Sequence, residues 1–327
     1  MTSKPLCIAA AGAGRMGRGI ALAFAWGGYA VALIDLKPRD TADAERFQRD
    51  AMDEIAANLA MLAELGALTD AEAQRVLSRI RPVPESLAAQ ALAAADVVFE
   101  CVPETLEAKR SALERICALA RPDAILASTT STILVTHLAP LVTQPERLIN
   151  AHWLNPAYLI PLVELSAHPG TAPDVISRLR ALIEGIGKVP VLCAATPGYI
   201  VPRLQALIMN EAARMVEEGV ASADDIDRAT RYGLGLRFSA IGVIEFIDYG
   251  GNDILYHASR YLGQHLSRER YSAPPIVDRL MQEGNIGLKS GQGFYDYRTR
   301  DLPAYRKDVL ARTLGALRHA GLFRPAR

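Results

Sequence analysis

The sequence predicts an α/β fold in which a doubly wound parallel sheet is followed by a second, all-helical domain. Apolar, strand-like runs alternate with helical periods from residue 4 to about residue 193, a pattern typical of a parallel sheet with helices on both faces. At Thr196-Pro197-Gly198 the pattern changes, and only helical periods follow. We therefore expect a sheet domain at 1–195, a helical domain at 196–297 and a C-terminal helical extension at 298–327.

The individual elements follow from apolar runs and helix signals. The expected strands are 5–10, 29–35, 96–101, 124–128, 147–151, 160–166 and 188–193. A helical insertion separates the second strand from the third. It begins with a helix at 43–65, and Thr69 with Glu72 forms a capping box that opens the next helix. The later helices are expected at 200–217, 223–232, 241–263, 274–284 and 303–320, and a glycine-rich turn is expected at 287–295.

Residues 6–35 form the most informative stretch. They read as a strand, the turn Gly12-Ala13-Gly14-Arg15-Met16-Gly17, a helix, and a second strand that ends in Asp35. The spacing G-x-G-x-x-G within a β-α-β frame, with an acid about 20 residues on, is the dinucleotide-binding signature of the Rossmann fold. Gly12 permits the tight turn, Gly14 lets a pyrophosphate approach the backbone, and Gly17 lets the helix lie close to the sheet. The free N–H groups at the start of the helix then face the phosphates.

Asp35 indicates that the cofactor is NAD. Its carboxylate can accept hydrogen bonds from the adenosine ribose hydroxyls, and its charge repels a 2′-phosphate. Lys37 and Arg39 lie just beyond it and keep NADP as an alternative. Within the turn, we expect cofactor contacts from Gly12, Gly14, Met16 and Gly17. The alternative interpretation is a glycine turn that binds no cofactor.

Composition limits the classes of partner. Half of the 327 residues are apolar, and 36 basic residues balance 36 acidic ones, so no net charge attracts nucleic acid or an anionic membrane. No apolar run reaches membrane-spanning length and no signal peptide is visible, so a cytoplasmic location is expected. The four cysteines are scattered without metal-ligand spacing, and no metal site is expected. The expected partner is therefore a small-molecule substrate.

His152 and Glu164 are the candidate catalytic pair. His152 follows an apolar strand, at the edge where α/β sheets place their ligands. Glu164 interrupts another apolar strand twelve residues later, and a buried carboxylate there needs a partner. Two neighbouring strands can bring the two side chains together, so that the acid orients the imidazole as a general base. A structural His–Glu pair in a hinge is the alternative.

Several motifs, in order along residues 5 to about 297, resemble the 3-hydroxyacyl-CoA dehydrogenase family. They are Val102-Pro103-Glu104 with Lys109, His152-Trp153-Leu154-Asn155-Pro156 with Glu164, Thr196-Pro197-Gly198-Tyr199-Ile200, and Gly291-Gln292-Gly293-Phe294-Tyr295. The resemblance implies NAD-dependent oxidation of a 3-hydroxyl group to a ketone, or the reverse reaction. It also implies a homodimer formed through the helical domain.

The resemblance implies roles for the residues that match. His152 is expected to be the catalytic base and Glu164 its partner. Ser131 is expected to hydrogen-bond the substrate oxygen, and Asn155 to support that site. Because Ser131 lies in a run of hydroxyl residues, it can equally be the N-cap of a helix at 132–138.

Glu104 and Lys109 are expected near the nicotinamide ribose on the same resemblance. Each has a simpler interpretation. Glu104 can be a first-turn acid of a helix at 104–120, where it interacts favourably with the helix dipole. Lys109 can be a solvated lysine on that helix.

Three features depart from the pattern of CoA-dependent relatives. Pro202 stands where the family usually has an asparagine that helps to hold the substrate, although a proline in the first turn of a helix is tolerated. Residues 50–74 contain no Lys or Arg to meet CoA phosphates. The segment Gly233–Phe238, with Tyr158–Glu164, resembles gulonate and carnitine dehydrogenases, and Arg237 within it is suited to bind a substrate carboxylate. An ordinary surface arginine is the alternative for Arg237.

Three functional hypotheses result. The first is hydride transfer between NAD and the 3-position of a hydroxyacyl-CoA of the 3-hydroxybutyryl type. The second is the same chemistry on a free 3-hydroxy acid held by Arg237. The third is a non-catalytic NAD-binding protein. The apolar stripe of the helix at 200–217 (Leu204, Ile208, Ala212 and Met215) is expected to take part in a homodimer, because it exceeds what one thin layer of helices must bury. An intramolecular core is the alternative.

Overall fold

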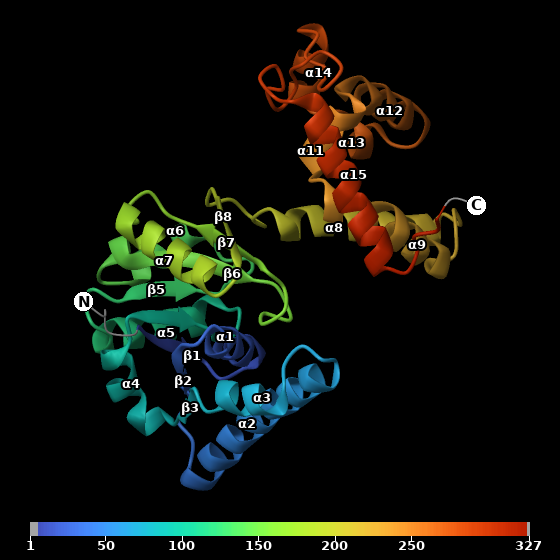
Figure 1. Cartoon of the computed structure of the whole chain (residues 1–327). Helices are drawn as coiled ribbons and strands as arrows, with labels where there is room; N and C mark the ends of the chain where they lie inside the picture. Colours follow the sequence, from blue (N-terminus) through green and yellow to red (C-terminus); the bar gives the residue numbers. More distant parts are fainter. Residues whose placement is uncertain (1–5, 326–327) are drawn as a thin grey trace. The chain divides into compact units, whose positions relative to one another are not determined.

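The computed structural model describes residues 6–325 (Figure 1). The chain divides into two compact units, one up to Met209 and one from Asn210 onward, and the division falls inside helix α8 (Val201–Glu217). The first residue of the strand predicted at 5–10 and the last two residues of the predicted extension lie outside the described part.

The first unit contains one eight-stranded sheet with the order β3-β2-β1-β4-β5-β6-β7-β8. All seven predicted strands are present. The strands are β1 (Cys7–Ala11), β2 (Ala30–Ile34), β3 (Ile80–Val83), β4 (Val97–Glu100), β5 (Ile125–Ser128), β6 (Leu148–Trp153), β7 (Leu162–Ser166) and β8 (Val189–Cys193).

Two features of the sheet correct the expectation. Strand β3 was not predicted, because its sequence Ile-Arg-Pro-Val lacks a clear apolar run. It lies at the edge of the sheet, where a proline is tolerated. Strand β7 runs antiparallel to β6, so the sheet is mostly rather than wholly parallel. The short connection between these two strands carries no crossover helix, which a parallel return requires.

Helices cover both faces of the sheet, as predicted. Because successive residues of a strand point to opposite faces, Ile8 packs in one core and Ala9 in the other. The first face is covered by α1 (Arg15–Trp26), α2 (Thr41–Glu64), α3 (Asp70–Leu77) and α7 (Pro173–Gly185). The opposite face is covered by α4 (Ala88–Ala94), α5 (Leu106–Leu119) and α6 (Val135–Leu138).

The predicted helix signals of the first unit are confirmed. The capping box of Thr69 and Glu72 opens α3, and α2 spans nearly the predicted range. The carboxyl ends of β1, β2, β4 and β5 meet at one edge of the sheet. The loops that follow them carry the glycine turn, Asp35, Glu104 and Ser131. Parallel topology therefore gathers the predicted site residues at one edge.

The second unit is helical in the described residues. After α8 its helices are α9 (Ala223–Ala229), α10 (Leu236–Ala240), α11 (Val243–Gly250), α12 (Asn252–His265), α13 (Arg268–Tyr271), α14 (Pro275–Gln282) and α15 (Leu302–His319). A π-helical turn, Thr230–Gly235, joins α9 to α10. The prediction of a single helix at 241–263 is wrong. The segment forms two helices, α11 and α12, which are separated at Gly251, whose φ is +110°.

The predicted glycine-rich turn at 287–295 is present and is held by Asp248. This buried carboxylate accepts the backbone N–H groups of Phe294 (2.9 Å) and Tyr295 (2.8 Å). Of the helices in residues 6–325, none is both long and apolar enough to span a bilayer.

Candidate functional site

The glycine turn after β1 has the shape that a bound pyrophosphate needs. At Gly12, with φ of +119°, a Cβ atom would lie 2.7 Å from the carbonyl of Cys101, and at Gly17 a Cβ would lie 1.9 Å from the carbonyl oxygen of Gly12. At Gly14, by contrast, a Cβ would meet no atom within 4 Å. The open space is thus beside Gly14, at the start of helix α1, which no side chain caps. The helix N-terminus therefore remains available to an anion.

Asp35 lies directly after β2, nearly buried. Its carboxylate accepts the backbone N–H of Lys37 (3.1 Å) and Nε of Arg39 (2.6 Å). The Arg39 guanidinium also lies 4.1 Å from the centroid of the Phe47 ring. Arg39, which sequence reasoning left as a candidate for a 2′-phosphate, is therefore paired with the acid that disfavours that group.

The structure brings His152 and Glu164 together. They are opposite each other in the antiparallel pair β6–β7, and Nδ1 of His152 lies 2.8 Å from Oε2 of Glu164. Both side chains are buried. An ionised carboxylate only accepts hydrogen bonds, so Nδ1 carries the hydrogen, and in the neutral form of the ring Nε2 is then the nitrogen with the lone pair.

Glu164 is held in its ionised form by its partners. Its second oxygen, Oε1, accepts the backbone N–H groups of Ile200 (2.9 Å) and Val201 (2.8 Å) at the start of α8. Burial alone raises the pKa of Glu164, but the hydrogen bonds from His152, Val201 and Ile200 outweigh it, and the pKa lies below its usual value. One carboxylate thus serves both the imidazole and the first turn of a helix.

Tyr199 belongs to this site, and no role was predicted for it. Its ring is stacked on the His152 imidazole, with centroids 4.9 Å apart and planes inclined by 10°. Its hydroxyl donates to the carbonyl of Thr130 (2.9 Å) and accepts from Nδ2 of Asn150 (3.0 Å). Its φ of +44° costs about 1–2 kcal/mol for a residue with a side chain. Only its place in the motif Thr196–Ile200 signalled it in the sequence.

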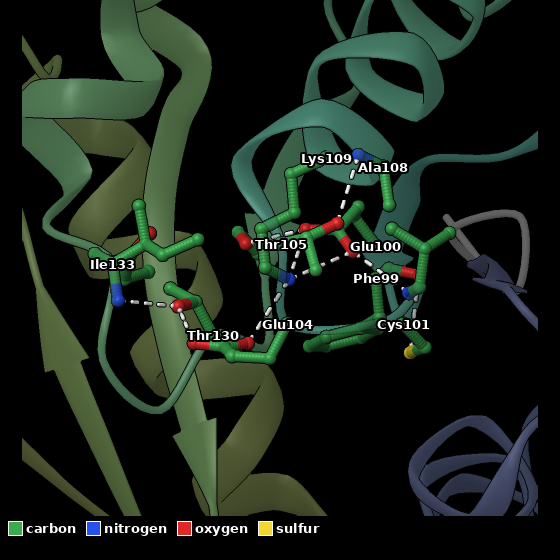
Figure 2. Close-up of polar contacts among 12 residues, drawn as sticks. Phe99, Glu100, Cys101, Glu104, Thr105, Ala108, Lys109, Thr130 and Ile133 are labelled. Carbon is green, nitrogen blue, oxygen red and sulfur yellow. Dashed lines mark hydrogen bonds and ion pairs between the residues drawn. The ribbon is translucent and has the colours of Figure 1, made fainter.

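Glu104 anchors the loop that carries Ser131, and Figure 2 shows its contact with Thr130, the residue before Ser131. Its Oε1 accepts the backbone N–H groups of Ser131 (2.9 Å) and Thr132 (2.8 Å), together with the hydroxyls of Thr130 and Thr132. Burial raises the pKa of Glu104, but these bonds and the charge of Lys109 lower it to about 2. Glu104 precedes the Thr105 cap of α5, so its interpretation as a first-turn acid is wrong.

Ser131 does not cap a helix. The next helix, α6, begins after Leu134, and no side chain caps it. The Ser131 side chain is half-buried, and its backbone is fixed by Glu104. The alternative interpretation as an N-cap is therefore wrong, while its contact with a substrate stays a prediction.

Lys109 is fully buried, so its interpretation as a solvated helix lysine is wrong. Its ammonium donates to both oxygens of Glu100 (3.1 and 3.0 Å) and lies 3.5 Å from Glu104 (Figure 2). Glu100 also accepts the Ser128 hydroxyl (2.6 Å) and the N–H of Val102 (2.8 Å). Lys109 thus reaches the predicted ribose region through Glu104, and its direct cofactor contact stays a prediction.

Asn155 follows β6 and lines a cavity of about 180 Å³. Arg15, Glu54 and Asn58 also line this cavity. The cavity adjoins helices α1 and α2, and Gly19 on α1 allows the loop after β6 to approach, since a Cβ there would lie 3.1 Å from Ala157. Asn155 is therefore placed beside an opening rather than in the core.

Arg237 is exposed, and Pro202 lies in the first turn of a helix. Arg237 is an exposed residue of α10, in the second unit, and its guanidinium lies 4.8 Å from the centroid of the Phe246 ring. Pro202 is the second residue of α8, the position where a missing N–H costs no helical hydrogen bond. Within residues 6–325, no group of three or more His, Cys, Asp or Glu side chains could hold a metal ion.

Comparison with known proteins places the chain in a family. Residues 7–196 match the NAD-binding domain of 3-hydroxyacyl-CoA dehydrogenase, and residues 198–297 match its C-terminal domain. The 3-hydroxyadipyl-CoA dehydrogenase of Escherichia coli is 36% identical over 292 residues, which are 89% of this chain and 59% of that protein. The chain therefore spans less than two thirds of this relative.

Two further proteins match over nearly their whole length. The 5-formyl-3-hydroxy-2-methylpyridine 4-carboxylate 5-dehydrogenase of Mesorhizobium japonicum is 33% identical over 314 residues, covering 95% of this chain and 96% of that protein. The solved structure of the 3-hydroxyacyl-CoA dehydrogenase of Archaeoglobus fulgidus superposes with a TM-score of 0.76 at 30% identity, covering 97% of this chain and all of that one.

Proposed function

The chain belongs to the 3-hydroxyacyl-CoA dehydrogenase family of NAD-dependent oxidoreductases, and we propose that it moves a hydride between NAD and C3 of a 3-hydroxyacyl-CoA of the 3-hydroxybutyryl type. The observation that carries the proposal is the 2.8 Å contact of His152 Nδ1 with the ionised Glu164. It leaves Nε2 as a proton acceptor at the edge of the sheet where Rossmann domains hold their ligands.

The residues present fit NAD. We propose that the backbone at Gly12, Gly14 and Gly17 holds the pyrophosphate at the start of α1, and that Met16 lies beside it. Asp35 then meets the adenosine ribose, and Glu104, braced by Lys109, meets the nicotinamide ribose. When bound, NAD supplies the acceptor for the hydride that leaves the alcohol carbon.

The protein's own side chains accept the proton of the substrate hydroxyl and return it in the reverse direction. Nε2 of His152 takes that proton as the hydride leaves C3, and Glu164 stabilises the resulting imidazolium. The Ser131 hydroxyl donates to the substrate oxygen, and Asn155 supports this arrangement. In the reverse direction the imidazolium returns the proton to the new alcohol.

A free 3-hydroxy acid is the second candidate substrate. Residues 50–74 offer no cation to CoA phosphates, and Arg237 offers an exposed guanidinium that can bind a carboxylate. The M. japonicum relative is named for a pyridine carboxylate rather than a thioester, whereas the E. coli relative is named for a CoA ester. The two lines of support therefore point to different substrates for the same chemistry.

Substrate turnover separates the candidates. NADH oxidation is followed with acetoacetyl-CoA, and NAD reduction with a panel of free hydroxy acids that includes gulonate and carnitine. Turnover of acetoacetyl-CoA supports the first proposal, and activity confined to free acids, lost in R237M, supports the second. NADH binding without turnover of any of these compounds would indicate a non-catalytic NAD-binding protein.

We also propose that the protein is a homodimer. Helix α8 has no buried residue among its 17, although it carries Leu204, Leu207, Ile208 and Met209, which are 41–67% exposed. Such an apolar face calls for a partner surface. A second copy of the chain is the partner that the family resemblance implies.

A further inference from the structure

We propose that Tyr199 is a positioning residue for the catalytic base: it holds the plane of the His152 ring and ties that ring to the loop that carries Ser131. This inference rests on the proposed function and adds a residue to it.

The two contacts of the His152 ring restrict different movements. Glu164 binds Nδ1 in the plane of the ring, at 2.8 Å, and so fixes one edge. It does not prevent the ring from tilting about that bond. Tyr199 covers the ring face at a centroid distance of 4.9 Å with nearly parallel planes, and this contact prevents the tilt. The contact thereby holds Nε2 in one position relative to a bound substrate.

The Tyr199 hydroxyl is anchored to two elements of the site. It donates to the carbonyl of Thr130, the residue before Ser131, and accepts from Asn150, two residues before His152 on β6. Thr130 in turn binds Glu104 through its hydroxyl. A continuous series of contacts therefore joins the predicted ribose-binding acid to the imidazole, with Tyr199 in the middle.

The backbone at Tyr199 is held in a strained conformation for the same arrangement. Its φ of +44° places the ring under His152 while the next two N–H groups, of Ile200 and Val201, point to Glu164. Such a conformation persists only where surrounding contacts determine it. The segment 199–201 thus contacts the ring face of His152 through Tyr199 and holds the Glu164 carboxylate through the N–H groups of Ile200 and Val201.

The test compares Y199F, which keeps the stacked ring, with Y199L, which removes it. Tyr29 provides the control, because it is half-buried in the same unit with its ring edge-on to Phe24, outside the site. Steady-state kinetics with the substrate found above, NADH titration, and the ¹H signal of His152 Nδ1–H, assigned by its absence in H152Q, are measured for each variant.

We expect Y199L to lose about 100-fold in kcat, since small displacements of a reacting group have effects of this size. Y199F should lose about fivefold in kcat, the equivalent of one hydrogen bond. The KM for NAD and the Kd for NADH should stay unchanged, and Y29L should match the wild type. The Nδ1–H signal should remain sharp in Y199F and broaden by exchange with water in Y199L.

The role of Tyr199 would be overturned if Y199L kept the wild-type kcat per NADH-binding site and a sharp Nδ1–H signal, while H152Q was inactive. Full activity of H152Q would instead overturn the proposed function. If Y199L does not bind NADH and is not folded, Y199F decides: a kcat equal to that of the wild type contradicts the hydroxyl anchor, and a fall with unchanged KM supports it.

Discussion

Glu164 accepts the backbone N–H of Val201 with one carboxylate oxygen and contacts Nδ1 of His152 with the other. The acid that orients the proposed base is therefore also the acceptor for the first turn of α8. Because both oxygens have partners, the carboxylate cannot turn away from the imidazole without leaving buried N–H groups unsatisfied. The orientation of His152 is thus secured by the start of a helix as well as by the sheet.

Replacing the proposed base should abolish turnover and spare the cofactor. H152Q keeps a polar side chain of similar size but cannot take a proton, so kcat should fall by about 10²–10⁴-fold. The Kd for NADH, measured by fluorescence titration, should change little, because no proposed cofactor contact is removed. A rate equal to that of the wild type would exclude His152 as the base.

Two glycines of the turn should respond differently to alanine. A Cβ at Gly14 meets no protein atom, so G14A should keep its melting temperature but bind NADH more than about tenfold more weakly, because the methyl group fills the proposed pyrophosphate space. A Cβ at Gly17 collides with the carbonyl of Gly12, so G17A should lose both stability and binding. Equal NADH affinity in G14A and the wild type would contradict the assigned site.

Breaking the buried pair of Lys109 and Glu100 should destabilise the first unit. K109M leaves the Glu100 carboxylate buried without its cation, which should lower the free energy of unfolding by about 3–5 kcal/mol in urea denaturation. The double variant K109M/E100Q should recover most of this loss, since no isolated charge remains. An additive loss in the double variant would show that the pair is not coupled.

Glu104 should make stability sensitive to acid. Its pKa lies at about 2 in the folded protein, below its usual value of 4.5, so its contribution is complete above pH 4.5 and is lost as the pH falls toward 2. In E104Q this contribution is absent at every pH. The difference in unfolding free energy between the wild type and E104Q should therefore narrow from pH 6 to pH 2.5, measured by urea denaturation at several pH values.

The exposed face of α8 should control the oligomeric state. Light scattering after gel filtration should give twice the mass of one chain for the wild type. L207E places a charge on this face and should shift the protein to the monomer. L65E changes a similarly exposed leucine at the end of α2 and should leave the dimer intact. A monomeric wild type at micromolar concentration would contradict the proposed homodimer.

Much of the fold could be predicted because its signals are local. The glycine spacing, the capping box of Thr69 and Glu72, and the apolar runs each depend on a few neighbouring residues, and all seven expected strands were found. Strand β3 and the direction of β7 could not be predicted in this way. β3 depends on pairing with β2, and the antiparallel return of β7 depends on the path of a short loop.

For the candidate site, too, local sequence signals predicted one part and tertiary contacts decided the other. The sequence by itself determined the cofactor class, the fold class and the candidacy of His152 and Glu164, because each of the two follows or interrupts an apolar, strand-like run. That the two strands are neighbours is a result of the tertiary structure. Only the tertiary structure decided that Lys109 is buried, that Glu104 holds the Ser131 loop, and that Tyr199 stacks on the imidazole. These are contacts between residues far apart in the chain, and no local period or motif spacing encodes which of them meet.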